Sequence, residues 1–544
     1  MTTTAVLRAC VVFVMLTAAA CTTSGERPPS TAQTARDMPP RDVIAAQVPV
    51  WSADDMQFFL HGSMSAEMVP ERVLRAFIAT YPDLFPREDL ANFGLIPDAT
   101  FGWPIGFSRR PVAHLAGLPS VGINCASCHA VELTSAAGGA PVRVLGATGH
   151  FDVEAFFGAL TVATFRTANP PTMREFLRGY LAAAPGGDDA TAQELLTAAW
   201  QRQGRQIATA MAADPAGAVG AGPGGLQTIS GAQLALDRAR LERERDLVPL
   251  VRSMLRLLHN VRAGLHIPDK IPSALPPASG PGRNDAFGLL SLSLFATPQT
   301  YSPVKFGIVW NLADRRWVHW DGNTQSPIAR NLLASLGLGA PLVGKRGWVE
   351  YPAVKRQTDL SEGIRAPLYP FAVDVTASGR GHKLYMTRCA GCHDGKESDA
   401  RLYGAMDVGT DPTRARLFTP ALAQRFNTFL AEVQVDGYVR PTSPGVRSTG
   451  KYWTPGLAGV WARAPYLHNG SVRTLAELLT HPSQRPAVWQ RGSRVYDTTA
   501  LGYTDEGPYR FDTRTPGNDN GGHAFGTDLA DADKRDLLEF LKTK

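Results

Sequence analysis

The chain has 544 residues, of which 44% are hydrophobic and 19% are charged, and its formal net charge at pH 7 is +6. This composition is typical of a globular protein and excludes the collagen-like, low-complexity and wholly disordered classes. The length allows about two to four domains. The small net charge does not require nucleic acid or an acidic membrane as a partner, and we expect no nucleic-acid binding. The 6 cysteines are too few for a disulfide framework.

The N-terminus has the layout of an export signal. Residues 1–20 contain one cation, Arg8, followed by an apolar run that ends in small residues. The run is too short for a transmembrane helix, so a cleaved signal peptide is expected. Cys21 follows directly and resembles the acylated cysteine of bacterial lipoproteins, although plain cleavage would leave it an ordinary residue. We expect a periplasmic protein, held to the outer membrane only by a lipid on Cys21, with a flexible tether over residues 21–45.

The other cysteines of the mature chain form two copies of one motif, CASCH at residues 125–129 and CAGCH at residues 389–393. Two thiols separated by two residues can reach the two vinyl groups at one edge of haem, and the adjacent histidine then binds the iron. A zinc site would need both CxxC pairs folded together. A thioredoxin-like redox pair would not explain why a histidine follows each CxxC pair. The motifs therefore predict two covalently bound haem c groups, attached through Cys125, Cys128 and His129, and through Cys389, Cys392 and His393.

The first motif lies in a long N-terminal haem domain, predicted over residues 46–370. This part exceeds what a minimal cytochrome domain requires, and we expect a helical insertion at about 176–280. Residues 213–225 are rich in Ala, Gly and Pro and predict a loop. The charged run from residue 229 to about 265 predicts a helix that Pro249 breaks or kinks.

Residues 371–544 predict a second haem domain. Residues 377–388 are expected to form a short helix that leads into the second motif. Residues 528–541 begin with an acidic turn and carry apolar residues at helical spacing, which predicts a terminal helix. A helix that leads into a haem motif and a terminal helix that packs on it are what a cytochrome c fold provides. The predicted fold class is therefore mainly α, with two cytochrome c-like haem domains and long loop-rich and helical insertions in the N-terminal one.

Several segments resemble known di-haem enzymes. HWDGN at residues 319–323 and WARAPYLHNGS at 461–471 are similar to segments of bacterial di-haem cytochrome c peroxidases and of the related methylamine-utilisation di-haem enzyme. GRNDAF at 282–287, the run at 330–337 and GGHAFGTDL at 521–529 more closely resemble the rubber oxygenase, or latex-clearing, branch of that superfamily.

The resemblance implies different roles for the two haems. His129 would hold a haem whose other face reacts with O₂ or peroxide. His393 would hold a six-coordinate haem that transfers electrons. Its second ligand would be His523, and the rival is His468, which could instead bond a haem propionate.

Three further residues gain expected roles. Trp320 would relay electrons between the haems, although an ordinary core tryptophan is the alternative. Arg330 could pair a propionate, because a planar guanidinium matches a carboxylate. His150 could cap the first haem, and otherwise stands in a loop or at the start of a helix.

The chemistry at the first iron stays open between several activities. The rubber oxygenase carries an aromatic residue shortly after its Arg-Asn pair, whereas residues 332–337 here read LLASLG and offer only an apolar wall. A peroxidase needs an acid–base residue over the iron, and the sequence indicates no Glu or His for that task. We expect an oxidoreductase that uses O₂ or H₂O₂ together with a substrate or redox protein. The alternatives are a dioxygenase that cleaves an apolar, polyisoprene-like alkene and a non-catalytic electron carrier.

Overall fold

A computed structural model describes residues 43–115, 117–167, 170–182, 278–295, 302–394, 401–440 and 445–544, together with residues 254, 258, 259, 261 and 262. The predicted signal peptide, Cys21, nearly all of the tether, the loop at 213–225 and most of the charged helix lie outside these residues. Among the residues described, no helix is long and apolar enough to cross a membrane.

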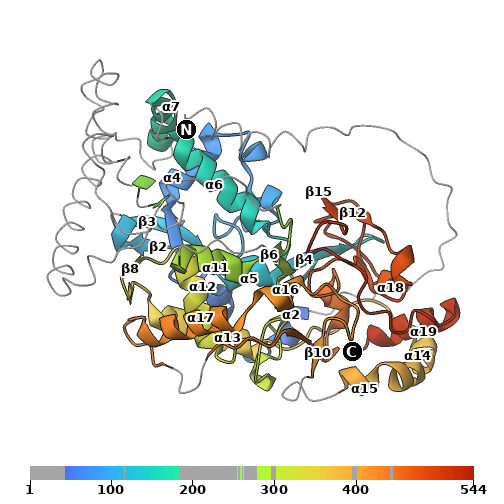
Figure 1. Ribbon diagram of the computed structural model, residues 1–544. Coiled ribbons are helices and arrows are strands. Elements are labelled where there is room, and N and C mark those ends of the chain that lie inside the picture. The colour runs from blue at the N-terminus through green and yellow to red at the C-terminus, as the bar shows by residue number, and fades with distance from the viewer. Residues whose placement is uncertain are drawn as a thin grey trace, which may run out of the picture.

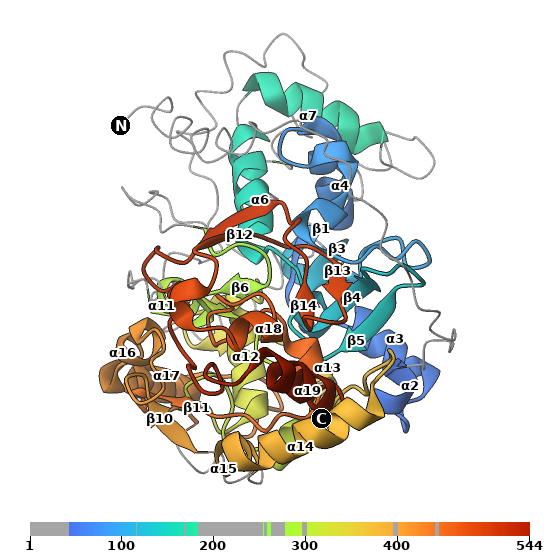
Figure 2. The ribbon, with the colours of Figure 1, turned by 90° about the vertical axis from the view of Figure 1, so that its right-hand side faces the viewer.

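Helices and a small sheet form one end of the molecule; the helices lie at the top of Figures 1 and 2, and the sheet lies below them. The sheet has the strand order β1-β3-β2 with antiparallel pairing throughout. Aromatic side chains join the sheet to the helices and the helices to one another. Phe107 of the sheet lies 5.8 Å from the helical residue Phe156, and Phe77 and Phe176, from two helices, lie 5.3 Å apart, between ring centroids. The elements of this end are β1 (Glu67–Pro70), α4 (Glu71–Thr80), β2 (Phe107–Val112), β3 (Leu118–Ile123), α6 (Val153–Thr167) and α7 (Pro170–Ala182).

A second sheet connects the two halves of the sequence. Its strands are β4 (Ala130–Ser135), β5 (Val142–Leu145), β13 (Val495–Asp497) and β14 (Gly502–Tyr503), in the order β14-β13-β4-β5. Strand β4 begins directly after His129 and pairs in parallel with β13, with Val495 opposite Thr134. The sheet therefore crosses the boundary predicted at residue 370.

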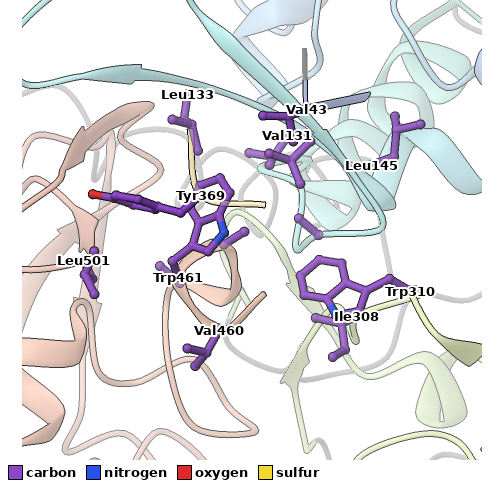
Figure 3. Packing of buried hydrophobic residues seen from close by; sticks show 14 of the residues in the cluster. Val43, Val131, Leu133, Leu145, Ile308, Trp310, Tyr369, Val460, Trp461 and Leu501 are labelled. Carbon is purple, nitrogen blue, oxygen red and sulfur yellow. The ribbon is translucent and has the colours of Figure 1, made fainter. Parts of the chain in front are cut away.

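One hydrophobic cluster packs beneath this sheet and contains residues from both halves. Figure 3 shows Val131 and Leu133 of β4 with Trp310, Trp461 and other side chains of the cluster. Trp310 and Trp461 are both fully buried. Burial of apolar surface stabilises by about 25 cal/mol per Å², so a shared cluster of this size holds the two predicted domains together as one body.

A helical layer packs around two apolar clusters. It comprises α11 (Ala286–Phe295), α12 (Pro327–Gly337), α13 (Tyr351–Gly363) and α17 (Pro420–Glu432). Helix α12 begins where the Ser326 hydroxyl accepts a hydrogen bond from the Ala329 amide, and Pro327 occupies a position whose missing N–H costs nothing.

The two helices predicted near the second motif are confirmed as α14 (Val375–Arg388) and α19 (Asp531–Leu541), which lie side by side in both ribbon views. A Cβ atom added to Gly381 would stand 1.9 Å from the Asp536 carbonyl oxygen, so the helices cross at close range. Asp536 also pairs with Arg380 at 2.6 Å. Phe540 packs 5.0 Å from Tyr385 between ring centroids. Helix α14 leads directly to the motif helix α15 (Ala390–His393).

The remaining helices and strands are short. The helices are α2 (Val43–Gln47), α3 (Ala53–His61), α5 (Cys125–His129), α16 (Thr413–Leu417) and α18 (Leu475–Leu478). The strands are β6 (Arg283–Asn284), β7 (Val304–Lys305), β8 (Leu342–Val343), β9 (Arg346–Gly347), β10 (Leu402–Gly404), β11 (Lys451–Trp453), β12 (Val488–Arg491) and β15 (Tyr509–Asp512).

The sheets were not expected in a mainly helical protein. Most of the strands have only two to four residues, too few to show a period-two pattern in the sequence. Several also pair with segments far away along the chain, as β4 does with β13. Local sequence patterns carry no information about such pairing.

Candidate haem sites

The first CxxCH motif is fixed by its immediate neighbours. Asn124 caps the motif helix α5, since its side-chain oxygen accepts from the Ala126 amide at 2.9 Å. Its amide nitrogen donates to the carbonyl of Gly62 at 2.9 Å. A Cβ atom on Gly106, whose φ is +89°, would lie 2.1 Å from the Ser127 nitrogen. Only glycine fits there, and the close approach of backbone holds the two sulfurs of the motif in place.

The cysteines of this motif pack against apolar clusters. Burial raises the pKa of Cys125 and raises that of Cys128 to about 12. Both are free, as are Cys389 and Cys392. Within the described ranges, no three His, Cys, Asp or Glu side chains gather as a metal ion would require. The two motifs are thus not joined in one zinc site, and each keeps a pair of thiols for thioether bonds.

His129 presents an uncharged imidazole beside these thiols. Burial, and next the positive charge of Arg330, lowers the pKa of His129 to about 3. Its buried Nδ1 atom makes no hydrogen bond of normal geometry within the described chain, although backbone at Gly307 and Ala147 opposes the shift slightly. A neutral imidazole with a ring nitrogen that no hydrogen bond occupies is the form that binds iron. The residues of the first motif therefore fit a haem.

Arg330 lies close to the same motif. Burial lowers the pKa of Arg330, and the neighbouring Cys125 and Glu362 act against that shift. Its Nε atom donates to the Asn331 side chain at 3.1 Å. Arg330 acts electrostatically on both Cys125 and His129, and it therefore belongs to the surroundings of the first motif.

The second motif holds its histidine through a backbone carbonyl. The Nδ1 atom of His393 lies 2.9 Å from the Pro455 carbonyl oxygen, to which it donates. This hydrogen bond fixes the tautomer and leaves the Nε2 lone pair for a metal. Burial lowers the pKa of His393, so the ring is neutral and able to bind.

His523 faces His393. The two ring centroids are 6.2 Å apart, and the ring planes are inclined by 43°. Two imidazoles on opposite sides of one iron, each with a metal–nitrogen bond of about 2 Å, have centroids roughly 6 Å apart. Burial, and next the charge of His393, lowers the pKa of His523 to about 4. Its Nδ1 atom is buried without a hydrogen-bond partner in the described chain. This pair fits a six-coordinate haem iron.

Arg485 holds the loop that carries His523. Its guanidinium donates to the carbonyl oxygens of Asn520 at 2.5 Å, Gly522 at 2.6 Å and His523 at 3.0 Å. His523 has a φ of +61°, a left-handed conformation that a non-glycine residue adopts at a cost. The arginine therefore stabilises the strained loop that positions the His523 imidazole.

His468 lies beside Thr410, which in turn borders Gly522 of the loop that carries His523. Its ring stacks on Tyr452 with centroids 4.2 Å apart, and its Nδ1 lies 3.4 Å from the Thr410 hydroxyl. Burial lowers the pKa of His468 to about 3. The structure therefore brings His523, and not His468, to His393.

Trp320 is partly buried, and Lys305 links it to the segment that carries His468. Its Nε1 atom donates to the Lys305 carbonyl at 2.9 Å, and the Lys305 amide donates to the His468 carbonyl at 3.0 Å. The ring packs against a small cluster that includes Tyr452. The ammonium of Lys305 lies 5.3 Å from the centre of the Trp320 ring and donates to the Pro465 carbonyl at 2.6 Å. Trp320 is thus held in a defined orientation next to aromatic rings.

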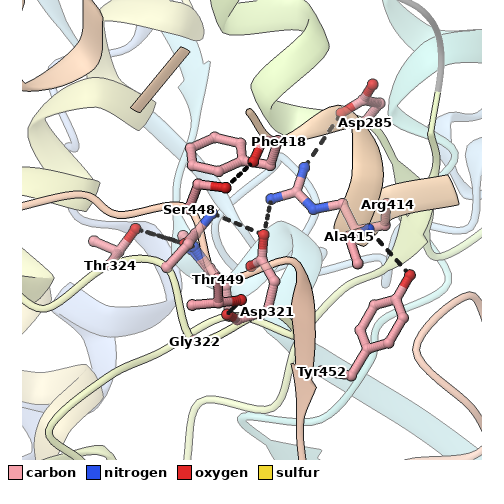
Figure 4. A network of polar contacts seen from close by, with 12 residues as sticks. Asp285, Asp321, Gly322, Thr324, Arg414, Ala415, Phe418, Ser448, Thr449 and Tyr452 are labelled. Atoms are coloured by element: carbon pink, nitrogen blue, oxygen red, sulfur yellow. Dashed lines mark hydrogen bonds and ion pairs between the residues drawn. The ribbon is translucent and has the colours of Figure 1, made fainter. Parts of the chain in front are cut away.

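A buried ionic network holds the segments that flank Trp320 (Figure 4). Arg414 donates to Asp321 at 3.1 Å and lies 3.7 Å from Asp285. Burial raises the pKa of both carboxyl groups, and Arg414 opposes this. Asp285 also accepts from the Gly288 and Ser302 amides, each at 3.0 Å. Two of the segments that resemble known di-haem enzymes are joined by this network.

The leucines of residues 332–337, which were expected to form an apolar wall over the first haem, pack into the protein core. Leu332 and Leu336 are fully buried in a cluster with Val354 and Val433. Leu333 packs in the neighbouring cluster of aromatic and aliphatic side chains. These side chains hold α12 against α13 and α17 and therefore do not line a substrate site.

His150 stands in the loop before α6, one of the two positions expected for it. Its ring lies 4.6 Å from that of Tyr503, edge to face. Burial, and next the charges of Arg494 and Arg491, lowers the pKa of His150 to about 3. It is a buried neutral histidine that packs on β14.

Sequence reasoning missed one residue near the first motif, His319. Its pKa is lowered to about 3 by burial, then by Arg330, with a smaller effect from His129. The nearness of His319 to the first motif depends on contacts among distant segments. The Trp-Asp-Gly sequence that follows His319 was the one feature of the sequence that could have pointed to this residue.

Comparisons with known proteins agree with a cytochrome. Residues 450–490 match the family described as RoxA-like, cytochrome c-like, which implies covalently bound haem c. This segment contains Pro455, the partner of His393. The chain is 31% identical over 330 residues to the protein named "Uncharacterized protein y4iM" of Sinorhizobium fredii (strain NBRC 101917 / NGR234), a match that covers 50% of this chain and 74% of that protein.

A second Sinorhizobium fredii protein, named "Uncharacterized protein y4iJ", is 27% identical over 356 residues, which covers 48% of this chain and 60% of that protein. The chain therefore belongs to the same protein family as y4iM and carries within it a RoxA-like, cytochrome c-like segment.

Proposed function

We propose that this protein is an exported di-haem c-type cytochrome oxidoreductase of the rubber oxygenase-like kind, with one reactive haem and one electron-transfer haem. The observation that carries the proposal is the difference between the two motif histidines. His393 faces a second imidazole at 6.2 Å, whereas the ring recorded beside His129 is that of Phe306, with centroids 6.3 Å apart, and a phenyl ring cannot bind iron. An iron with two histidine ligands has no open position, and an iron with one has room for an oxidant.

Each haem would be held by residues of this chain. Cys125, Cys128 and His129 would hold the N-terminal haem. Cys389, Cys392, His393 and His523 would hold the C-terminal one. Haem supplies one-electron and oxygen chemistry when bound, and the protein supplies attachment, orientation and exclusion of water.

The electron path proposed between the sites runs through Trp320. The ring is fixed by its hydrogen bond to Lys305 and stacks into a group with Tyr452, on which His468 lies. Burial lowers the pKa of the Lys305 ammonium well below its ordinary value, which reduces the positive charge beside the ring. We expect the Trp320 ring, held in one orientation among aromatic neighbours, to transfer electrons between the sites.

The anchor and the compartment rest on the sequence. A signal peptide with Cys21 after it supports export and lipid attachment, and covalent haem attachment takes place outside the cytoplasm. The oxidant is O₂ or H₂O₂, and the reducing partner is a small substrate or a redox protein.

The RoxA-like match at residues 450–490 supports the polyisoprene-cleaving alternative, whereas the leucines expected to form its apolar wall pack into the protein core. Oxygen uptake with squalene is expected to remain flat. Uptake that depends on squalene would restore this alternative.

Electron paramagnetic resonance of the purified protein tests the proposed roles. We expect one high-spin and one low-spin ferric signal of equal integrated intensity, with the high-spin signal alone changed by peroxide. Two low-spin signals that peroxide leaves unchanged would contradict the proposal and indicate a pure electron carrier.

A further inference from the structure

Lys305 is a lysine in the protein interior whose side chain ends on backbone carbonyls. The residue is only 2% exposed. Its Nζ atom donates to the carbonyl oxygen of Arg463 and to that of Pro465, the second at 2.6 Å. A buried lysine nitrogen is costly unless it finds partners. These two hydrogen bonds therefore fix the end of the side chain at one place.

The backbone of Lys305 joins further segments of the chain. Its carbonyl oxygen accepts from Nε1 of Trp320 at 2.9 Å, and its amide donates to the His468 carbonyl at 3.0 Å. Lys305 also pairs across strands β6 and β7 with Arg283. The turn that carries Trp320 and the segment 463–468 are thus both bonded to this one residue.

The side chain of Lys305 lies among aromatic rings with little room to move. Its Nζ atom is 5.3 Å from the centre of the Trp320 ring and 5.8 Å from that of Tyr466. Behind it, a Cβ atom added to Gly470 would lie 3.3 Å from the Lys305 Cβ and 2.9 Å from the Arg491 guanidinium. The lysine therefore fills the space beside the Trp320 ring.

We propose that Lys305 is the positioning residue of the Trp320 relay: its Nζ, fixed by the carbonyls of Arg463 and Pro465, holds the indole in the orientation that transfers electrons between the haem sites. The step carried by the ring moves one electron from one iron to the other, and no bond or proton is exchanged. This inference rests on the proposed function, in which Trp320 is the relay.

The test replaces the side chain and leaves the backbone bonds in place. Lys305→Met keeps a similar length and volume but cannot donate to the two carbonyls. The full-length, fully oxidised di-haem protein receives less than one electron per chain from methyl viologen radical made by pulse radiolysis. The redistribution of that electron between the haems is followed at their Soret bands.

We expect this redistribution to be about tenfold slower in Lys305→Met, because misplacement of a reacting group by about 1 Å can slow a step by up to about 10²-fold. The spin states and the reduction potentials of both haems should stay as in the wild type. Those readouts exclude a general disturbance of either haem. Lys305→Gln, whose amide can still donate, should give an intermediate rate, and it serves where the methionine variant does not fold.

Trp320→Phe shows whether Lys305 acts through the indole. Residues that act through one another have non-additive effects, so Lys305→Met should cause no further slowing in the Trp320→Phe background. The matched control is Lys355→Met, because Lys355 is exposed and pairs with Asp359 at 2.6 Å on the surface. This control should keep the wild-type rate.

Two results would overturn the inference. One is a wild-type transfer rate in folded Lys305→Met or Lys305→Gln while Trp320→Phe slows transfer. The other is an equal slowing by Lys305→Met with and without Trp320, which would mean that the lysine acts by another route. A wild-type rate in Trp320→Phe itself would instead remove the relay, and it thereby separates failure of the proposed function from failure of the positioning role.

Discussion

The imidazole rings of His393 and His523 lie with their centroids 6.2 Å apart, although 129 positions separate them in the chain. Replacement of His523 by Gly is therefore expected to convert one low-spin haem to high spin, with the covalent haem content unchanged. His468→Gly is the control and should keep the low-spin spectrum, because His468 stacks on Tyr452. Visible and paramagnetic resonance spectra measure both. The reverse pattern would transfer the ligand role to His468.

Arg485→Leu is expected to lower both the free energy of unfolding and the low-spin fraction. The guanidinium is buried and donates to at least three carbonyl oxygens of the His523 loop. Buried acceptors that lose their donor cost about 1–3 kcal/mol each, so a loss of about 3 kcal/mol or more is expected. Denaturant unfolding followed by the Soret band measures it.

The conservative variant Arg485→Lys provides the comparison. The lysine ammonium cannot reach the same set of carbonyl oxygens as the planar guanidinium, so we expect a loss of stability between those of the wild type and of Arg485→Leu. A leucine variant with wild-type stability and spectrum would show that the loop holds its shape without the arginine.

Two glycines of α14 test the helix crossing beside the second motif. Gly381→Ala places a Cβ 1.9 Å from the Asp536 carbonyl oxygen and should destabilise by about 1–3 kcal/mol. Gly379→Ala meets nothing within 4 Å and should stabilise by about 0.5–1 kcal/mol, since alanine favours the helix. Thermal unfolding separates them. Equal midpoints for the two variants would contradict the close crossing of α14 and α19.

Acid should destabilise the protein partly through His150. Burial lowers its folded pKa to about 3, whereas an unfolded histidine titrates near 6.5. Because the folded pKa is the lower one, the unfolded state takes up the proton first, and stability is lost as the pH falls from about 6.5 toward 3. The loss from this group is about 1.4 kcal/mol per pH unit within that window.

His150→Leu should remove this contribution. Between pH 7 and pH 5 the variant should lose about 2 kcal/mol less than the wild type, as measured by denaturant unfolding at the two pH values. His481→Leu, at an exposed histidine, is the control and should keep the wild-type slope. Parallel pH dependence in the wild type and His150→Leu would show that His150 is protonated in the folded protein.

Local signals were sufficient for part of this structure. The CxxCH spacing alone is enough to predict covalent haem attachment. The acidic first turn and the helical spacing of apolar residues at 528–541 predict a helix without reference to distant segments. Helices α14 and α19 were predictable for that reason, and so was the loop position of His150.

The rest depends on contacts between distant segments. Strand β4 finds its partner β13 after more than 350 residues, and no local pattern encodes that choice. The ring of His319 packs against Phe287, which lies 32 positions earlier in the chain. The leucines of α12 have the same apolar character in a core as in a substrate wall, so the sequence could not distinguish the two.

Haem content per chain tests the central claim most directly. The pyridine haemochrome assay, normalised to protein by amino-acid analysis, should give two haem c per chain in the purified protein, with an α band typical of two thioether bonds to each haem. A ratio of one haem per chain would contradict the di-haem account, including the separate reactive and electron-transfer roles assigned to His129 and His393.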